Sequence, residues 1–509
     1  MDEHQGSLDV QEWTIADTLY GYIGSRFSVQ DVTRAYKDRI GRLNSTLNAI
    51  TVVAKDAIEQ AQKLDEAFKK TGKLVGPLHG IPIVIKDQIE TAGMVTTFGS
   101  KLAANFVPRE DAHLVKLLRD AGAVILAKTT MPDWAAAWFS TSSATEVTFN
   151  PYDLSRDPGG SSSGTGAAVA ANLALVGIGG DTGGSIRLPS SFCNLVGVRV
   201  TPGRISRHGM SALVTTQDTP GPMTRSVEDA ARLLDVLVGF DEKDNYTSVN
   251  AIAQSPVTPE MNPSFLTAVR PPPFSWNNRP LEGKTFGVLR AAFGAHKGII
   301  ALMNTTIEGL ARLGAQVVDV EIPDLDHYKT YTSSYGTRSR SDINEFLAAR
   351  KSPDLPETLD AAYEAKVWHP ALDLIPHIMQ GPPNAVDDGA FASRLLAQTE
   401  FQRVVASVFA KQKLDAMLYP TCQVPAPTTK DVVGGRWTCL TFPTNTVIAS
   451  QLLFPAISVP VGFVEAEENG VEVPMGMEIL GLPYGEAKIL GVAAATERMA
   501  QARKLPPLK

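Results

Sequence analysis

The sequence is poor in the residues that most often bind metals or form cross-links. Three of its 509 residues are cysteines, and the scattered positions of Cys193, Cys422 and Cys439 suit neither a disulfide framework nor a four-ligand zinc site. We therefore expect no metal and a reducing compartment. Histidine, the usual general base, occurs eight times. His79 lies near a glycine-rich motif, but a lone histidine in a turn is more often structural, so we do not assign it to the chemistry.

The sequence also lacks an excess of positive charge and a long hydrophobic run. Its formal net charge is −7, which gives no electrostatic reason to bind nucleic acid or an anionic membrane. Residues 164–180 form the longest weakly polar run, but this run is rich in alanine and glycine and suits a buried helix leading into a strand. The acidic N-terminus lacks the basic and apolar regions of a signal peptide. We expect a cytoplasmic protein that binds neither nucleic acid nor a membrane.

Short apolar runs alternate with amphipathic stretches along the chain, which is the order expected of an α/β layered fold. Ser28-Val-Gln-Asp31 resembles a capping box that opens a helix. Residues 250–284 are rich in proline, asparagine and serine and predict a surface excursion. The predicted helices cover residues 28–43, 53–69, 111–121, 226–240, 297–313 and 484–502, and the predicted strands cover residues 81–85, 123–127, 285–289, 316–320, 416–419, 456–461 and 475–480.

Three segments carry most of the chemical information. Residues 80–87 read Gly-Ile-Pro-Ile-Val-Ile-Lys-Asp, residues 158–164 read Pro-Gly-Gly-Ser-Ser-Ser-Gly, and residues 181–187 read Asp-Thr-Gly-Gly-Ser-Ile-Arg. A glycine and serine cluster taken alone is most often a turn. The chain contains no Gly-x-x-x-x-Gly-Lys-Ser/Thr phosphate loop. Residues 160–164 match the Gly-x-Ser-x-Gly elbow of α/β-hydrolases, but a loop precedes them and no histidine follows His377, so we take this match to be accidental.

Lys86 is the best candidate for a general base. It closes the apolar run 81–85, so we expect its amine at the buried end of a strand, where desolvation favours the neutral form. A lysine that snorkels at a strand edge is the ordinary alternative. Lowering a lysine pKa from about 10.4 to roughly 7–8 requires about 4 kcal/mol, which burial can supply. With two serine hydroxyls in glycine-rich backbone, this lysine provides most of what a serine hydrolase without histidine needs.

The chain resembles the amidase signature family of Ser-Ser-Lys hydrolases. The resemblance extends throughout residues 76–240 and is looser in the C-terminal half. Ser185 follows Ser161 by 24 residues, the usual spacing of the family's two catalytic serines, which selects Ser161 over Ser162 and Ser163. The matching motifs include Gly76-Pro-Leu-His-Gly80-Ile-Pro, Lys86-Asp87, Pro158-Gly-Gly-Ser-Ser, Gly180-Asp-Thr-Gly-Gly-Ser-Ile-Arg-Leu-Pro-Ser190, Asp218-Thr-Pro-Gly-Pro-Met-Thr-Arg-Ser226, Leu418-Tyr-Pro-Thr421 and Gly481-Leu-Pro-Tyr-Gly485.

The resemblance implies a set of catalytic roles. It makes Ser185 the nucleophile, Lys86 the general base and later the acid, and Ser161 the relay between them. It also implies a cis peptide bond between Gly160 and Ser161. No cofactor belongs to this mechanism.

The resemblance also implies how the nucleophile is supported. The backbone of Thr182, Gly183, Gly184 and Ser185 would form an oxyanion hole, where glycine allows N–H groups to approach the substrate closely. The supporting residues would be Ser162, Asp181 and Arg187, the last two as a structural brace.

The fold implied by the resemblance is one large α/β/α layered domain with a central twisted mixed β-sheet covered by helices. Within a single domain of residues 1–509, residues 1–75 would be an N-terminal helical arm and residues 76–240 the core that carries the catalytic residues. The excursion at 250–284 would precede residues 285–509, which supply the remaining strands and helices and a wall of the substrate pocket.

The substrate is the least determined feature. Apolar and aromatic residues predict a pocket for an apolar or aromatic acyl group, and the tentative lining residues are Met131, Trp134, Trp138, Phe139, Met210 and Trp437. We expect an amidohydrolase that cleaves a small or medium carboxamide, or else a carbamate or ester, through an acyl-enzyme. Its partners would be the small amide and water, and it could form a homodimer. Two alternatives stay open: a glutaminase subunit of a tRNA-dependent amidotransferase, and a non-catalytic binding protein on the same fold.

Overall fold

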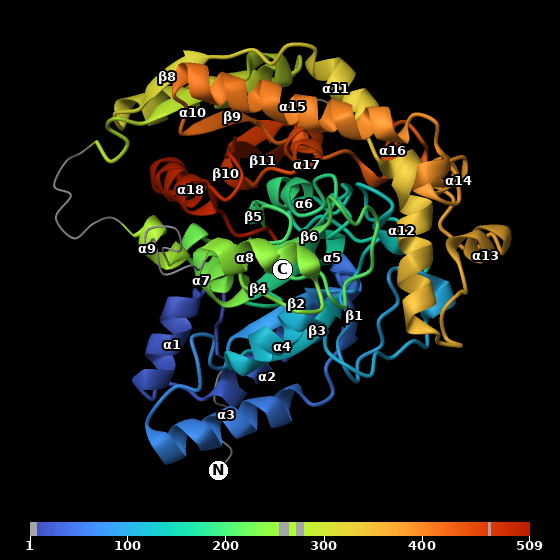
Figure 1. Cartoon of the computed structure of the whole chain (residues 1–509). Coiled ribbons are helices and arrows are strands. Elements are labelled where there is room, and N and C mark those ends of the chain that lie inside the picture. The colour runs from blue at the N-terminus through green and yellow to red at the C-terminus, as the bar shows by residue number, and fades with distance from the viewer. Residues whose placement is uncertain (1–7, 254–263, 271–278, 467–469, 509) are drawn as a thin grey trace.

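The computed structural model describes residues 8–253, 264–270, 279–466 and 470–508 (Figure 1). Much of the excursion predicted at residues 250–284 lies outside these ranges, as does its triple proline at 271–273. The described part of the excursion contains a short helix, α9 (Phe265–Val269), which packs against helices from both halves of the chain.

The described residues form one mixed β-sheet of eleven strands in the order β1-β3-β2-β4-β6-β5-β10-β11-β9-β7-β8. The strands are β1 (Ile50–Val53), β2 (Pro82–Lys86), β3 (Val124–Thr129), β4 (Val176–Asp181), β5 (Val196–Arg199), β6 (Thr219–Thr224), β7 (Thr285–Val288), β8 (Gln316–Asp319), β9 (Ala416–Pro420), β10 (Ala456–Glu465) and β11 (Glu472–Leu480). Pairings β2–β3, β2–β4, β7–β8 and β7–β9 are parallel and the others are antiparallel. The sheet therefore joins the N-terminal and C-terminal halves of the sequence.

Helices cover both faces of the sheet. Figure 1 shows α7 and α18 on one side of the central strands and α5, α6 and α17 on the other. Besides α9, the α-helices of the described residues are α1 (Ile15–Ile23), α2 (Val29–Leu47), α3 (Ala57–Thr71), α4 (His113–Asp120), α5 (Ser163–Ala170), α6 (Arg187–Phe192), α7 (Val227–Leu237), α8 (Ser248–Ala253), α10 (Lys297–Arg312), α11 (Leu325–Tyr331), α12 (Tyr335–Arg350), α13 (Leu359–Glu364), α14 (Leu374–Met379), α15 (Phe391–Gln412), α16 (Thr429–Val433), α17 (Thr446–Leu452) and α18 (Glu486–Ala500). The predicted α/β architecture with a central mixed sheet is confirmed.

The centre of the sheet positions the glycine-rich segments. Strands β2 and β4 run parallel with Ile83 opposite Val176 and Ile85 opposite Ile178. Because the carboxyl ends of parallel strands meet at the same edge of a sheet, Lys86 at the end of β2 lies beside the end of β4. Every residue of both strands is buried. The lysine is therefore delivered to a solvent-poor edge directly beside the segment that begins at Asp181.

Several predicted elements are present with small shifts in their ends. The capping box at Ser28 forms, because its hydroxyl accepts the Asp31 amide and the Asp31 carboxylate accepts the Ser28 amide. Helix α2 continues to Leu47, beyond the predicted end at residue 43. The region predicted as a helical arm also contributes strand β1, which pairs antiparallel with β3.

Other elements have no counterpart in the sequence-based assignment. Strand β6 carries Pro220 and Pro222 while pairing on both sides, and proline normally argues against an interior strand. Helix α12 was missed because Ser339, Ser341 and Asp342 are buried in its N-terminal half, so an apolar stripe covers only part of the helix. In Figure 1, helices α11 to α14 form a layer beside the sheet.

Replacing Gly164, near the start of α5, should destabilise the protein. A Cβ atom there would lie 2.3 Å from the Ala49 carbonyl oxygen and 2.4 Å from the Thr130 amide nitrogen. Because both atoms belong to backbone, rotation of a side chain cannot relieve the overlap. We expect Gly164→Ala to lower the free energy of unfolding by about 3 kcal/mol, measured by denaturant titration.

Gly41→Ala provides the matched control. Gly41 lies within α2, and a Cβ there would meet no atom within 4 Å. This change should raise the free energy of unfolding by up to about 1 kcal/mol, because alanine is the better helix former. If the two variants had equal unfolding midpoints, the close approach at Gly164 would carry no energetic weight.

Candidate catalytic site

Lys86 is fully buried and bound to a serine. Its Nζ atom donates a hydrogen bond of 2.7 Å to Ser161 Oγ and one of 3.3 Å to the Gly180 carbonyl oxygen. Burial lowers the pKa of Lys86 to about 7, although the carboxylates of Asp181 and Asp218 pull in the opposite direction. With such a pKa, about half of the amine is neutral at pH 7 and can accept a proton.

The three consecutive serines have different environments. The peptide bond between Gly160 and Ser161 is cis, as the sequence predicted. Ser162 Oγ lies 3.2 Å from both the amide nitrogen and the carbonyl oxygen of Gly180, so it fixes the end of β4. The hydroxyl of Ser163 is buried and has no hydrogen-bond partner among the described residues. Only the first of the three touches Lys86 in the described part of the chain.

The segment from Thr182 to Ser185 presents unused backbone donors. Within the described part of the chain, the amides of Gly183, Gly184 and Ser185 donate no hydrogen bond. Gly184 has a φ of +134°, a conformation that a side chain would make costly. The Thr446 hydroxyl, at the start of α17, donates a hydrogen bond of 2.7 Å to the Gly183 carbonyl oxygen and so holds the loop. Free backbone amides are one kind of donor from which an oxyanion site can be built.

Ser185 is the last residue of this loop and joins it to the cluster of serines. Its side chain is 3% exposed, and its carbonyl oxygen accepts a hydrogen bond of 3.1 Å from the Ser162 amide. The cluster of serines and the glycine-rich loop are thus tied together through backbone. Sequence-predicted residues separated by up to 99 positions, from Lys86 to Ser185, are brought to one buried edge of the sheet.

A buried charge network supports the loop. Arg187 donates through Nε and Nη2 to both carboxylate oxygens of Asp181 at 3.1 Å, and Arg199 donates to the same carboxylate at 2.9 Å. Burial alone would raise the pKa of Asp181, but the two arginines outweigh it and hold this pKa well below its usual range. Arg187 also contacts Glu478 on β11. The brace predicted for Asp181 and Arg187 therefore extends into the C-terminal half of the sheet.

Asp218 is a further buried carboxylate, to which the sequence analysis gave no role although it begins one of the matching motifs. It accepts hydrogen bonds from the hydroxyl of Thr182 and from the amides of Leu213 and Val214. Burial raises the pKa of Asp218 to about 6. The neighbouring Gln217 donates from its side chain to the Thr182 carbonyl oxygen at 3.0 Å. These two residues hold Thr182, the first residue of the loop, from both ends.

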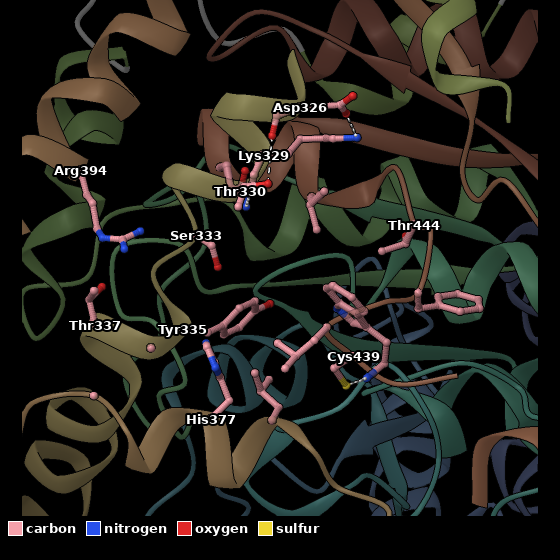
Figure 2. Close-up of a pocket in the computed structure, with 18 of the residues that line it drawn as sticks. Asp326, Lys329, Thr330, Ser333, Tyr335, Thr337, His377, Arg394, Cys439 and Thr444 are labelled. Carbon is pink, nitrogen blue, oxygen red and sulfur yellow. Dashed lines mark hydrogen bonds and ion pairs between the residues drawn. The ribbon is translucent and has the colours of Figure 1, made fainter. Parts of the chain in front are cut away.

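A cavity of about 860 Å³ lies near this loop, although none of the residues 182–185 is among those that line it. Trp138 and Tyr335 line the cavity, and a Cβ atom built on Gly183 would lie 2.1 Å from Tyr335 Oη and 3.3 Å from Trp138 Nε1. Figure 2 shows the side chains of Ser333, Tyr335 and His377 around the open space, with Arg394 and the Asp326–Lys329 pair at its margin. The cavity thus has an aromatic wall beside the loop and charged groups farther away.

The residues that the sequence predicted for the pocket fall into three groups. Trp138 lines the large cavity. Met210 and Trp437 line smaller cavities of about 180 Å³ and 350 Å³. Met131 and Trp134 pack in one buried apolar cluster and Phe139 packs in another.

Tyr335 and Arg394 were missed by sequence reasoning. They lie on helices α12 and α15, more than 140 positions after Ser185. No local motif marks either residue, so the fold alone brings them to the cavity.

Two kinds of feature are absent from the described residues. No group of three or more His, Cys, Asp or Glu side chains there is arranged to hold a metal ion. Within the same ranges, no helix is both long enough and apolar enough to span a bilayer.

Comparisons with known proteins agree along nearly the whole chain. The family model described as Amidase matches residues 31–490. A glutamyl-tRNA(Gln) amidotransferase subunit of Alkaliphilus metalliredigens is 32% identical, over 96% of this chain and 97% of that protein. Native peptide amidase from Stenotrophomonas maltophilia matches with a TM-score of 0.82 and 29% identity, over 97% of this chain and 98% of its own. The corresponding amidotransferase subunit from Thermotoga maritima matches with a TM-score of 0.75 and 27% identity, over 99% and 100%.

These relatives overturn one expectation. The predicted partners were a small amide and water, with a second copy of the chain in a homodimer, whereas the curated relatives are named as subunits of an amidotransferase. That prediction was wrong because it rested on the motifs of the catalytic centre. These motifs do not report on protein partners, and many interfaces are no more apolar than the rest of a protein surface.

The buried amine should cost stability at neutral pH. The pKa of Lys86 is about 7 in the folded state and 10.5 for an ordinary lysine, so the unfolded chain binds more protons between these values. The free energy of unfolding therefore rises with pH across that window. We expect Lys86→Met to be more stable than wild type at pH 7, by about 3 kcal/mol, with the advantage shrinking toward pH 10.

Denaturant titrations at several pH values would measure this difference. Ser161→Ala serves as the control, because it removes the hydrogen-bond partner of Lys86 and keeps the amine. A stability gain in Lys86→Met that stayed constant from pH 6 to pH 10 would contradict desolvation of the amine.

Proposed function

This chain belongs to the amidase family, and on that premise we propose that it hydrolyses the carbon–nitrogen bond of a carboxamide through an acyl-enzyme on Ser185. The observation that carries the proposal is the hydrogen bond of 2.7 Å from the buried Lys86 amine to Ser161, next to a loop with three unused amides. A base, a relay hydroxyl and an oxyanion site are the parts that acyl transfer requires.

In the proposed reaction, the hydroxyl oxygen of Ser185 attacks the amide carbon. Its proton passes to Ser161, whose own proton passes to the neutral amine of Lys86. The negative charge that develops on the substrate oxygen is met by amides of the loop that includes Gly183 and Gly184. The proton then returns through Ser161 to the leaving nitrogen, which departs as ammonia or an amine.

The second half of the reaction reuses the same groups. Water attacks the acyl-enzyme and gives its proton to Lys86 through Ser161. The bond between the acyl carbon and the Ser185 oxygen breaks, Ser185 regains a proton, and the acyl group leaves as a carboxylic acid. Asp181, held by two arginines, stays ionised and keeps the loop in place.

For the substrate, glutamine is the proposal that the curated relatives favour. They are named as glutamyl-tRNA(Gln) amidotransferase subunits, at 32–33% identity over nearly the whole chain. In this proposal the chain is the subunit that releases ammonia from glutamine and works with protein partners.

A second substrate, the terminal carboxamide of a peptide, has one specific observation in its favour. The solved structure of a peptide amidase matches with a TM-score of 0.82, against 0.75 for an amidotransferase subunit. A cavity of about 860 Å³ with an aromatic wall would also accept an acyl group larger than that of glutamine, including an apolar or aromatic one.

Labelling by a fluorophosphonate tests the nucleophile. Wild-type protein should gain one adduct by intact mass, and Ser185→Ala should gain none. Lys86→Ala should label at least 100-fold more slowly, because the hydroxyl loses its base. Ser163→Ala is the matched control and should label as wild type does, since the Ser163 hydroxyl has no partner within the described residues. Absence of labelling in the wild type would favour a non-catalytic binding protein.

Ammonia release distinguishes the two substrates. If the chain is a glutaminase subunit, it should hydrolyse glutamine, faster when copurified with the partner subunits of its source organism, and should leave peptide carboxamides intact. Hydrolysis of peptide carboxamides by the isolated chain, with no release from glutamine in either state, would reject the glutaminase proposal. Ser185→Ala, assayed alongside, accounts for any contaminating activity.

A further inference from the structure

The charged margin of the large cavity contains two cations in different states. Lys329 is paired with Asp326 at 2.8 Å, so its charge is compensated at hydrogen-bond distance. Arg394, on α15, has its Nε atom 3.8 Å from a carboxylate oxygen of Asp388, which is beyond a hydrogen bond. Of these two cations, Arg394 is the one whose ion pair is loose.

Arg394 also has at least one hydrogen-bond donor without an acceptor among the described residues. A guanidinium group carries five N–H donors in a planar fork. One nitrogen, Nη1, donates to the Tyr331 carbonyl oxygen at 2.7 Å, while the buried Nε atom has no hydrogen-bond acceptor among the described residues. Tyr331 holds the side chain in place in two ways. Its carbonyl oxygen accepts this hydrogen bond, and the centre of its ring lies 5.0 Å from the guanidinium carbon.

The guanidinium group is directed into the cavity. Figure 2 shows it pointing from α15 toward the space that Ser333 and Tyr335 line, and its side chain is 31% exposed. Tyr335 also borders Gly183 of the glycine-rich loop. The cavity that Arg394 borders is therefore adjacent to the loop through Tyr335, which lines the one and lies against the other.

We infer that Arg394 binds a carboxylate of the substrate, so that the preferred substrates are amides whose acyl part carries a carboxylate at its far end. The inference rests on the proposed function and narrows its substrate class. Planar carboxylates match the guanidinium fork in two parallel hydrogen bonds, which gives both charge and direction. Monoamides of dicarboxylic acids and amino acids with a side-chain carboxamide belong to this class.

Matched substrate pairs test the inference. Succinamate, glutaramate and adipamate carry the carboxylate, and butyramide, valeramide and hexanamide are their uncharged counterparts of similar length. For at least one length, the wild-type kcat/KM should favour the charged amide at least tenfold. In Arg394→Gln that ratio should fall at least tenfold, and Arg394→Lys should restore part of it, because lysine keeps the charge without the fork.

Arg403→Gln is the matched control on the same helix. Arg403 is 70% exposed, pairs with Glu400 and does not line this cavity. This variant should keep the wild-type ratio. Equal kcat/KM values for charged and uncharged amides in the wild type, or a ratio unchanged in Arg394→Gln, would overturn the inference and leave Arg394 as a structural partner of Asp388.

Binding to Ser185→Ala separates this inference from the proposed reaction. Calorimetry would measure the binding of glutaramate and of valeramide without turnover. The two proteins to compare are Ser185→Ala and the double variant Ser185→Ala with Arg394→Gln. Tighter binding of glutaramate that is lost in the double variant supports the carboxylate site even if no amide is hydrolysed. Equal dissociation constants for the two amides reject it, whereas failure of the reaction itself appears as absent fluorophosphonate labelling.

Discussion

The desolvated amine of Lys86 is the constraint on which the site depends. The parallel strands β2 and β4 end together at a fully buried edge, and this placement takes the amine out of water. Asp181 and Asp218 both favour the charged form, so an uncompensated carboxylate nearby would undo the effect of burial. Two arginines share the charge of Asp181. Burial of Lys86 therefore costs folding free energy, and the arginines weaken the effect of the nearby carboxylate that would otherwise raise the lysine pKa.

The same network connects the site to the second half of the chain. Arg187, which follows the glycine-rich loop, contacts Glu478 on β11. The Glu478 carboxylate also accepts a hydrogen bond of 3.0 Å from the hydroxyl of Tyr419 on β9. The Thr446 hydroxyl holds the Gly183 carbonyl oxygen from α17. The loop is thus fixed by elements more than 230 positions away in the sequence. Such fixation matters for an oxyanion site, because donors that are already oriented need no rearrangement when charge develops.

The sequence predicted much of this centre and little of its surroundings. Lys86, Ser161 and Ser185 could be selected because short motifs with fixed spacing carry them, and strand β2 follows from a continuous apolar run. Asp218 could not be assigned, because its role comes from contacts with Thr182 and the loop at Leu213 that only the fold creates. Helix α12 was missed because the buried face of its N-terminal half is polar. Aromatic residues near the catalytic motifs were poor guides to the pocket: Trp134 packs in an apolar cluster, while Tyr335 comes from α12.

The residues of the proposed catalytic centre and those of the large cavity come from different parts of the sequence. Lys86, Ser161 and the glycine-rich loop lie within residues 86–185, whereas much of the large cavity is built from residues 326–451. A change on α12, α14 or α15 can alter the cavity without displacing Lys86, because the sheet and the buried charge network hold the lysine and the loop independently. One centre can therefore serve acyl groups of different size and charge, and the family alone does not specify the substrate. On this chain the position that distinguishes charged from uncharged acyl groups is the loosely paired guanidinium of Arg394.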